Sequence, residues 1–127
     1  MQIRLSNAAD APAPVGQYTH AVEVTGASRT VYISGQVGAA MDGSVPEDAT
    51  EQGRNVWKNI TAQLKAVNMT VDNIVKIVTI VTSLDHLAAV RASRSEFLGD
   101  RKPASTLIVG GLVSPALKIE VEVIAVG

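Results

Sequence analysis

The chain has no cysteine among its 127 residues. This absence excludes a disulfide framework, a thiolate nucleophile and a cysteine-ligated metal site. No apolar run approaches the roughly 18 residues of a membrane-spanning helix, and the first ten residues lack the apolar core of a signal peptide. We therefore expect a cytoplasmic protein that makes no membrane contact.

Aromatic residues are scarce, since the chain holds only Tyr18, Tyr32, Trp57 and Phe97. The net charge is −1, with acidic and basic residues interspersed. Nucleic-acid-binding proteins usually carry a basic face or aromatic side chains on which bases stack. The sequence shows neither feature, so we expect no nucleic-acid partner.

Apolar residues are plentiful by contrast and make up 46% of the chain. The length predicts a single domain over residues 1–127, which would bury roughly two thirds of its unfolded surface. A small chain this apolar is also expected to bury part of its surface against copies of itself.

Hydrophobic spacing predicts two helices and several strands. The clearest helix runs from about residue 48 to 67, and a second spans about 84 to 98. Residues 18–24 and 30–34 flank a Gly-Ala-Ser turn, which predicts a hairpin between them. Further strands are predicted at residues 2–6, 73–82, 106–109 and 117–126.

Two sequence patterns compete for the start of the first helix. Asp48 with Glu51 resembles a capping box, and Ser44 with Glu47 has the same spacing. Asn68 is suited to the left-handed position that follows the helix.

The predicted order, β-β-(β)-α-β-α-β-β, favours an α+β sandwich in which two helices cover one face of a single mixed sheet. The strand at 73–82 is apolar on both faces, which is typical of a strand covered on both sides. Because the chain offers only two long helices, we expect another subunit to cover the second face.

Few side chains are grouped for chemistry. His20 and His86 lack neighbours at metal-ligand spacing, so no metal site is predicted. No glycine-rich phosphate loop and no nucleophile elbow is present. Glu120 and Glu122 share one face of the last strand, where they are either solvated or placed at an inter-subunit cleft to hold a water or a proton.

Three arginines form a second candidate group. Arg91 and Arg94 lie near the apolar stripe of the second predicted helix, and Arg101 lies in the loop that follows. They either lie on a solvated helix flank or bind the carboxylate of a ligand. The second alternative is open because only arginine offers a planar two-donor fork.

Four segments, in this order and spacing, resemble the YjgF/RidA family of imine and enamine deaminases over nearly the whole chain. They are Gly16-Gln-Tyr-Thr-His-Ala21, Val31-Tyr-Ile-Ser-Gly-Gln36, Glu51-Gln to Asn59-Ile with the following Val75-Lys-Ile-Val-Thr, and Pro103-Ala-Ser-Thr with Ile119-Glu-Val-Glu-Val-Ile-Ala125. The resemblance implies a chorismate-mutase-like fold and a homotrimer whose sheets form a central barrel. It also implies small-molecule clefts between subunits and no metal or organic cofactor.

The resemblance further implies roles for single residues. Tyr18 matches a tyrosine of the cleft, Gly35 matches a glycine whose backbone lines it, and Glu120 matches the glutamate that positions the attacking water. The arginine that binds the substrate carboxylate is replaced by Ser105, which Thr106 follows as the pattern requires. We expect Ser105 and Thr106 to contact the ligand.

Serine offers one hydroxyl and no charge, so losing the arginine would cost about 2–4 kcal/mol of ligand binding. Arg91, Arg94 or Arg101 would have to supply the guanidinium from another direction, and Arg91 itself replaces an asparagine common in the family. Three hypotheses follow from these matches. They are deaminase-type hydrolysis with a Glu120-positioned water, non-catalytic binding of a small carboxylate metabolite, and RNA cleavage.

Overall fold

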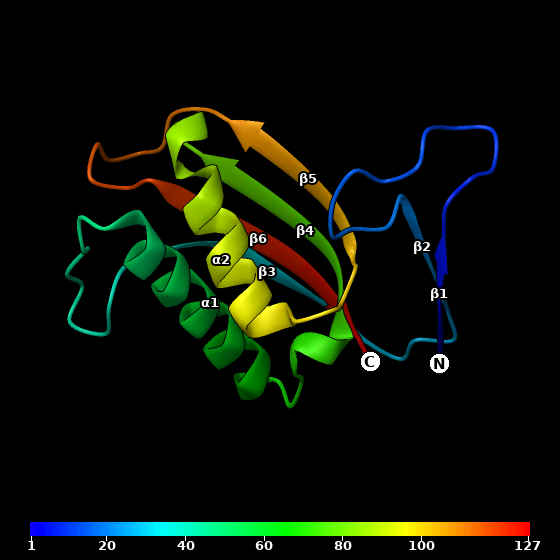
Figure 1. The fold of residues 1–127 in the computed structure, drawn as a ribbon. Coiled ribbons are helices and arrows are strands. Elements are labelled where there is room, and N and C mark those ends of the chain that lie inside the picture. Colours follow the sequence, from blue (N-terminus) through cyan, green and yellow to red (C-terminus); the bar gives the residue numbers. More distant parts are fainter.

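The computed structural model describes residues 1–127 and contains a four-stranded mixed sheet with two helices on one face (Figure 1). The strand order is β3-β6-β4-β5, in which β4 and β5 are parallel and the other pairs are antiparallel. The fold class predicted from the sequence is therefore confirmed. The sheet and helices comprise β3 (Thr30–Val37), α1 (Ala49–Ala66), β4 (Ile74–Val81), α2 (Leu87–Leu98), β5 (Ala104–Val109) and β6 (Ile119–Val126), with short 3₁₀ turns at Val71–Asn73 and Leu84–His86.

The alternation of side chains along β6 decides which face of the sheet is buried. Ile119, Val121 and Val123 are each only 2% exposed and point toward the helices. Glu120 and Glu122 fall between them and therefore point to the opposite face. β6 lies between β3 and β4, so its apolar residues are central to the hydrophobic core.

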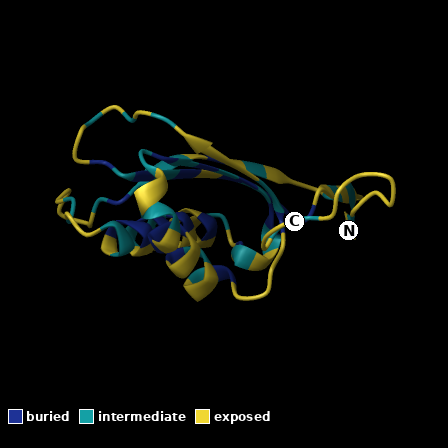
Figure 2. Ribbon diagram, turned by 45° about the horizontal axis from the view of Figure 1, so that its top comes forward, coloured by how far each residue is buried: buried dark blue, intermediate teal, exposed yellow.

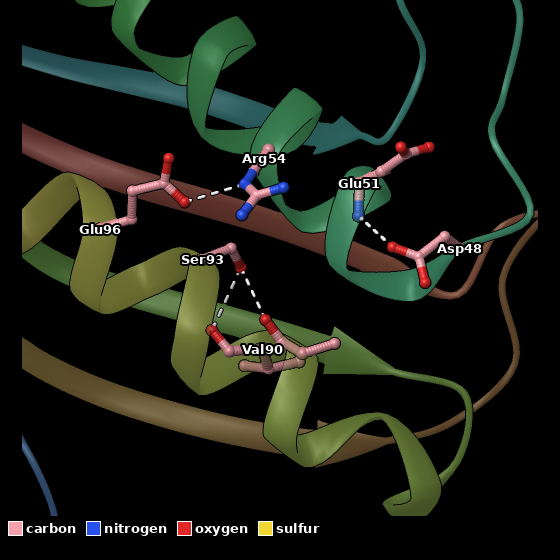
Figure 3. A network of polar contacts seen from close by, with 7 residues as sticks. Asp48, Glu51, Arg54, Val90, Ser93 and Glu96 are labelled. Atoms are coloured by element: carbon pink, nitrogen blue, oxygen red, sulfur yellow. Dashed lines mark hydrogen bonds and ion pairs between the residues drawn. The ribbon is translucent and has the colours of Figure 1, made fainter.

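Helix α1 begins at the first of the two competing caps. Asp48 Oδ2 accepts a hydrogen bond from the Glu51 backbone N–H at 2.9 Å (Figure 3). Ser44 instead donates its hydroxyl to Asp42. At the other end Asn68 adopts a φ of 59°, so the predicted left-handed position is confirmed.

The two helices approach closely at Gly53 of α1 and Ser93 of α2. A Cβ at Gly53 would lie 2.8 Å from Ser93 Cβ, closer than real carbon atoms approach. Ser93 Oγ is buried and donates to the Ala89 and Val90 carbonyls of its own helix (Figure 3). A surface ion pair between Arg54 and Glu96 joins the same two helices.

The predicted hairpin between residues 18–24 and 30–34 is wrong. β2 (Ala21–Thr25) pairs with β1 (Gln2–Ser6) in a separate two-stranded sheet, and β3 pairs with β6. β3 supplies Ile33 to the hydrophobic core, whereas every residue of β1 and β2 is exposed or half-buried. The turn at 26–28 therefore carries the chain from the small sheet to the large one (Figure 1).

One face of the large sheet carries no helix. Figure 2 shows both helices on one side of the sheet and no element over the other. Apolar side chains lie open on that face, with Tyr32 76% and Ile108 45% exposed. The expectation that another subunit covers this face stays a prediction. No helix of the structure is both long and apolar enough to cross a bilayer.

The contact between Gly53 and Ser93 makes a testable prediction. Gly53→Ala should lower the free energy of unfolding by about 1 kcal/mol, because overpacking outweighs the gain in helix propensity. In a Ser93→Gly background the same change should become stabilising, because the obstructing Cβ is gone. Ser93→Ala is an intermediate case, since it removes Oγ, the Ser93 atom nearest the new Cβ, but keeps the Ser93 Cβ at 2.8 Å, so part of the cost should remain. Urea unfolding of the six proteins, with Gly or Ala at position 53 in each of the three backgrounds, measures these values. Stabilisation by Gly53→Ala in every background would contradict the contact.

Candidate functional site

A cleft of about 770 Å³ lies between α2, the edge strand β5 and the loop before β2. The Thr19 backbone N–H donates to the Pro103 carbonyl at 3.3 Å, and Thr19 bridges to Ala104, so the loop is held beside the start of β5. The cleft opens along the free edge of β5, since Ser105, Thr106 and Leu107 all line it. Its other lining residues are Val15, Gly16, Gln17, Tyr18, His20, Thr79, Leu87, Val90, Arg91, Arg94 and Ser95.

Arg94 reaches from α2 across the cleft. Its Nη1 donates to Ser105 Oγ at 2.8 Å, and its Nη2 donates to the Gln17 carbonyl at 2.6 Å. Burial lowers the pKa of Arg94, because the charged guanidinium loses hydration. Arginine nevertheless keeps its proton in proteins, so the cleft contains a partly desolvated positive charge.

Ser105 and Thr106 point to opposite faces of β5. Ser105 pairs with Ile77 in the parallel register, so its hydroxyl lies on the helix side, where Arg94 contacts it. Thr106 lies on the bare side and accepts a hydrogen bond from Lys76 Nζ at 3.1 Å. Both belong to the lining because β5 is an edge strand.

Tyr18 and His20 form the wall of the cleft opposite α2. Their rings meet edge to face, with centroids 5.5 Å apart. His20 Nε2 lies 2.8 Å from the Pro12 carbonyl, and the His20 backbone N–H donates to Asn7. Sequence reasoning missed His20 as a cleft residue, although its place two residues after Tyr18 in the loop was the available signal.

Glu120 and Gly35 adjoin each other but lie outside this cleft. A Cβ at Gly35 would meet Glu120 Cδ at 2.7 Å, so the glycine leaves room for the carboxylate. The ladder between β3 and β6 shifts by one residue between Ile33 and Gln36, and this bulge contains Gly35. Both residues are half-buried, and Glu120 points to the bare face of the sheet. Within one chain the sheet therefore separates Glu120 from Arg94.

The three candidate arginines lie in two different places. Arg94 and Arg91 both line the cleft. Arg101 instead pairs with Asp72, with its Nε 2.6 Å from Oδ1, and donates to the Leu98 carbonyl. No group of three or more His, Asp or Glu side chains lies close enough to hold a metal ion.

The architecture is that of known Rid-family structures. The crystal structure of YyfB from Yersinia pestis, a Rid-family protein of unknown function, matches with a TM-score of 0.85 and 28% identity, covering 100% of both chains. RidA from the Antarctic bacterium Psychrobacter sp. matches with a TM-score of 0.73 and 28% identity, covering 98% of this chain and 99% of that one.

Sequence comparison points the same way. The family model described as Endoribonuclease L-PSP matches residues 8–127. A goat (Capra hircus) protein named 2-iminobutanoate/2-iminopropanoate deaminase is 31% identical over 125 residues, which cover 97% of this chain and 89% of that protein. The chain belongs to the YjgF/RidA family.

The contact between Gly35 and Glu120 can be tested by stability. Gly35→Ala should lower the free energy of unfolding by about 1–2 kcal/mol, because the new Cβ meets the Glu120 side chain. In a Glu120→Ala background the cost should fall below about 0.5 kcal/mol, because the obstructing atoms are removed. Glu122→Ala, two residues along the same face, is the matched control and should leave the cost unchanged. An equal cost in all three backgrounds would show that Gly35 and Glu120 do not meet.

Proposed function

We propose that this protein is a deaminase-type hydrolase that converts small imino or enamino acids to the corresponding oxo acids and ammonia. Arg94 binds the substrate carboxylate, and Glu120 holds the attacking water. Support comes from the hydrogen bond between Arg94 and Ser105 and from relatives of about 30% identity named 2-iminobutanoate/2-iminopropanoate deaminase.

The hydrogen bond between Arg94 and Ser105 is the observation that carries this proposal. The family resemblance implies a guanidinium on β5 at position 105, where this chain has serine. Arg94 brings a guanidinium to that serine from α2. A guanidinium has five N–H donors, and two of them serve Ser105 and Gln17. Three donors remain, enough for the paired hydrogen bonds that a carboxylate accepts.

The reaction also needs a group that handles the water. Glu120 is the family-implied residue, and in the proposed step its carboxylate accepts a proton as the water oxygen bonds to the imine carbon. Glu120 passes that proton to the imine nitrogen, which gives a carbinolamine. The carbinolamine hydroxyl then loses its proton to the amino group as the carbon–nitrogen bond breaks, so ammonia leaves and the oxo acid remains. Because Glu120 and Arg94 lie on opposite faces of one sheet, we propose a homotrimer in which each cleft pairs Arg94 with Glu120 of a neighbouring subunit.

A second candidate is non-catalytic binding of a small carboxylate metabolite. The separation of Arg94 from Glu120 within one chain favours it, since a cleft with Arg94 alone binds an acid without hydrolysing it. RNA cleavage, which the description of the family model names, draws no support from a chain of net charge −1.

The catalytic roles predict specific losses of activity. With freshly generated 2-iminopropanoate or 2-iminobutanoate, the wild-type protein should speed ammonia release. Glu120→Gln should lower kcat by about 100-fold, because the proton acceptor is lost. Arg94→Gln should lower kcat/KM by about 10- to 100-fold, because a charge-assisted hydrogen bond is lost. Arg54→Gln, which alters a surface arginine outside the cleft, is the control and should retain full activity.

A relocation experiment separates loss of the guanidinium from general damage. Ser105→Arg in the Arg94→Gln background returns a guanidinium to β5 and should recover most of the lost kcat/KM. No catalysis by the wild-type protein, with tight binding of 2-oxobutanoate, would favour the binding function over hydrolysis. Full activity of both Glu120→Gln and Arg94→Gln would refute the assigned roles.

If the protein is a trimer, substitutions on the bare face of the sheet should change its oligomeric state. Sedimentation should give roughly three times the 13.3 kDa chain mass. Tyr32→Glu, on the bare face, should shift the species toward the monomer, because a charge would be buried in the interface. Met41→Glu alters a fully exposed loop residue and should leave the assembly unchanged. A monomeric wild-type protein would exclude a catalytic cleft shared between subunits.

A further inference from the structure

The part of the cleft that one chain forms contains two guanidinium groups and no carboxylate. Arg91 and Arg94 are three residues apart on α2, so they lie on the same side of the helix. Both line the cleft, and none of the fourteen lining residues is Asp or Glu. The arginines therefore give the lining of one chain two positive charges.

Arg91 is also unlike the other arginines of the chain. Arg4, Arg54 and Arg101 pair with carboxylates, and Arg29 donates to two carbonyls that follow α1. Arg94 donates to neutral oxygens of the cleft. Arg91 takes part in none of the ion pairs and side-chain hydrogen bonds of the structure, so all of its donors remain available at the mouth of the cleft.

Within one chain these two cations have no neutralising partner and repel each other, and the half-buried one has also lost hydration. An anionic ligand with one negative group neutralises the charge of Arg94 and leaves Arg91 without a partner. A ligand with two negative groups neutralises both, and each guanidinium then uses its two-donor fork on its own carboxylate.

The geometry points to a small dicarboxylic acid as the ligand of this cleft: we infer that Arg94 binds its first carboxylate beside Ser105, and Arg91 binds its second at the mouth. For the first carboxylate this inference rests on the proposed function, and it extends that function to the 2-imino or 2-oxo dicarboxylic acids. Leu87, Val90 and Leu107 supply apolar surface for the carbon chain between the two carboxylates.

The spacing of the two arginines limits the length of the acid. Residues three apart on a helix have Cβ atoms about 5–6 Å apart, so their side chains suit carboxylates at a similar separation. A spacer of about two or three carbon atoms between the carboxyl groups fits that separation. Succinate and glutarate have such spacers, whereas malonate is too short.

Isothermal titration of the intact protein with simple acids tests the inference without requiring catalysis. The probes are butanoate, malonate, succinate, glutarate and 3-phosphonopropanoate. Succinate or glutarate should bind about three- to tenfold more tightly than butanoate, and this preference should shrink as salt is added. Malonate should bind no more tightly than butanoate.

Variants assign the two carboxylates to the two arginines. Arg91→Gln should remove the preference for the dicarboxylates and leave butanoate affinity within about twofold, because Arg91 is exposed and contacts only the second carboxylate. Arg94→Gln should weaken binding of all the acids, and Arg94→Lys should restore part of it because the charge returns without the fork. Arg54→Gln, the control outside the cleft, should change no affinity.

The inference is overturned if butanoate and glutarate bind equally, if Arg91→Gln weakens both to the same extent, or if 3-phosphonopropanoate binds more tightly than either dicarboxylate. Its failure is distinguishable from failure of the proposed function. Butanoate binding through Arg94 without a dicarboxylate preference would leave the deaminase proposal standing. Dicarboxylate binding through both arginines, without ammonia release from any imino acid, would support this inference and refute hydrolysis.

Discussion

The packing of β6 against α1 is the interaction on which the rest of the structure depends. β6 lies inside the sheet, hydrogen-bonded to β3 on one side and β4 on the other. Its alternating side chains bury Ile119, Val121 and Val123 beneath the helices, which commits Glu120 to the opposite face. Because a strand has only two faces, the residues of β6 that build the core also determine where the Glu120 carboxylate points.

The charge in the cleft arises from a similar constraint. The serine at position 105 is small enough to let a side chain from α2 reach β5, and Arg94 occupies that space. A guanidinium that has lost hydration and has only neutral partners within the chain favours a bound anion. The cleft therefore retains a cationic centre although its strand lacks the arginine that the family resemblance implies.

Most of the fold could be predicted from local patterns. The stripe on α1, the cap at Asp48 and the left-handed Asn68 are encoded within a few residues, and the structure contains all three. The hairpin between β2 and β3 was predicted wrongly, because strand pairing depends on partners far away in the sequence. β3 pairs with β6, which lies some ninety residues later in the chain, because β3 has a face that is buried in the core and β2 has none.

The α+β class, the positions of both helices and the family could be inferred without the structure, because periodicity and motif spacing are local properties. The sequence also placed Glu120 and Glu122 on one face. The identity of the arginine that reaches Ser105 depends instead on tertiary packing, because Arg91, Arg94 and Arg101 lie close together along the chain and differ only in the direction of their side chains. The helix turns Arg91 and Arg94 toward β5, while Asp72 holds Arg101 away from the cleft.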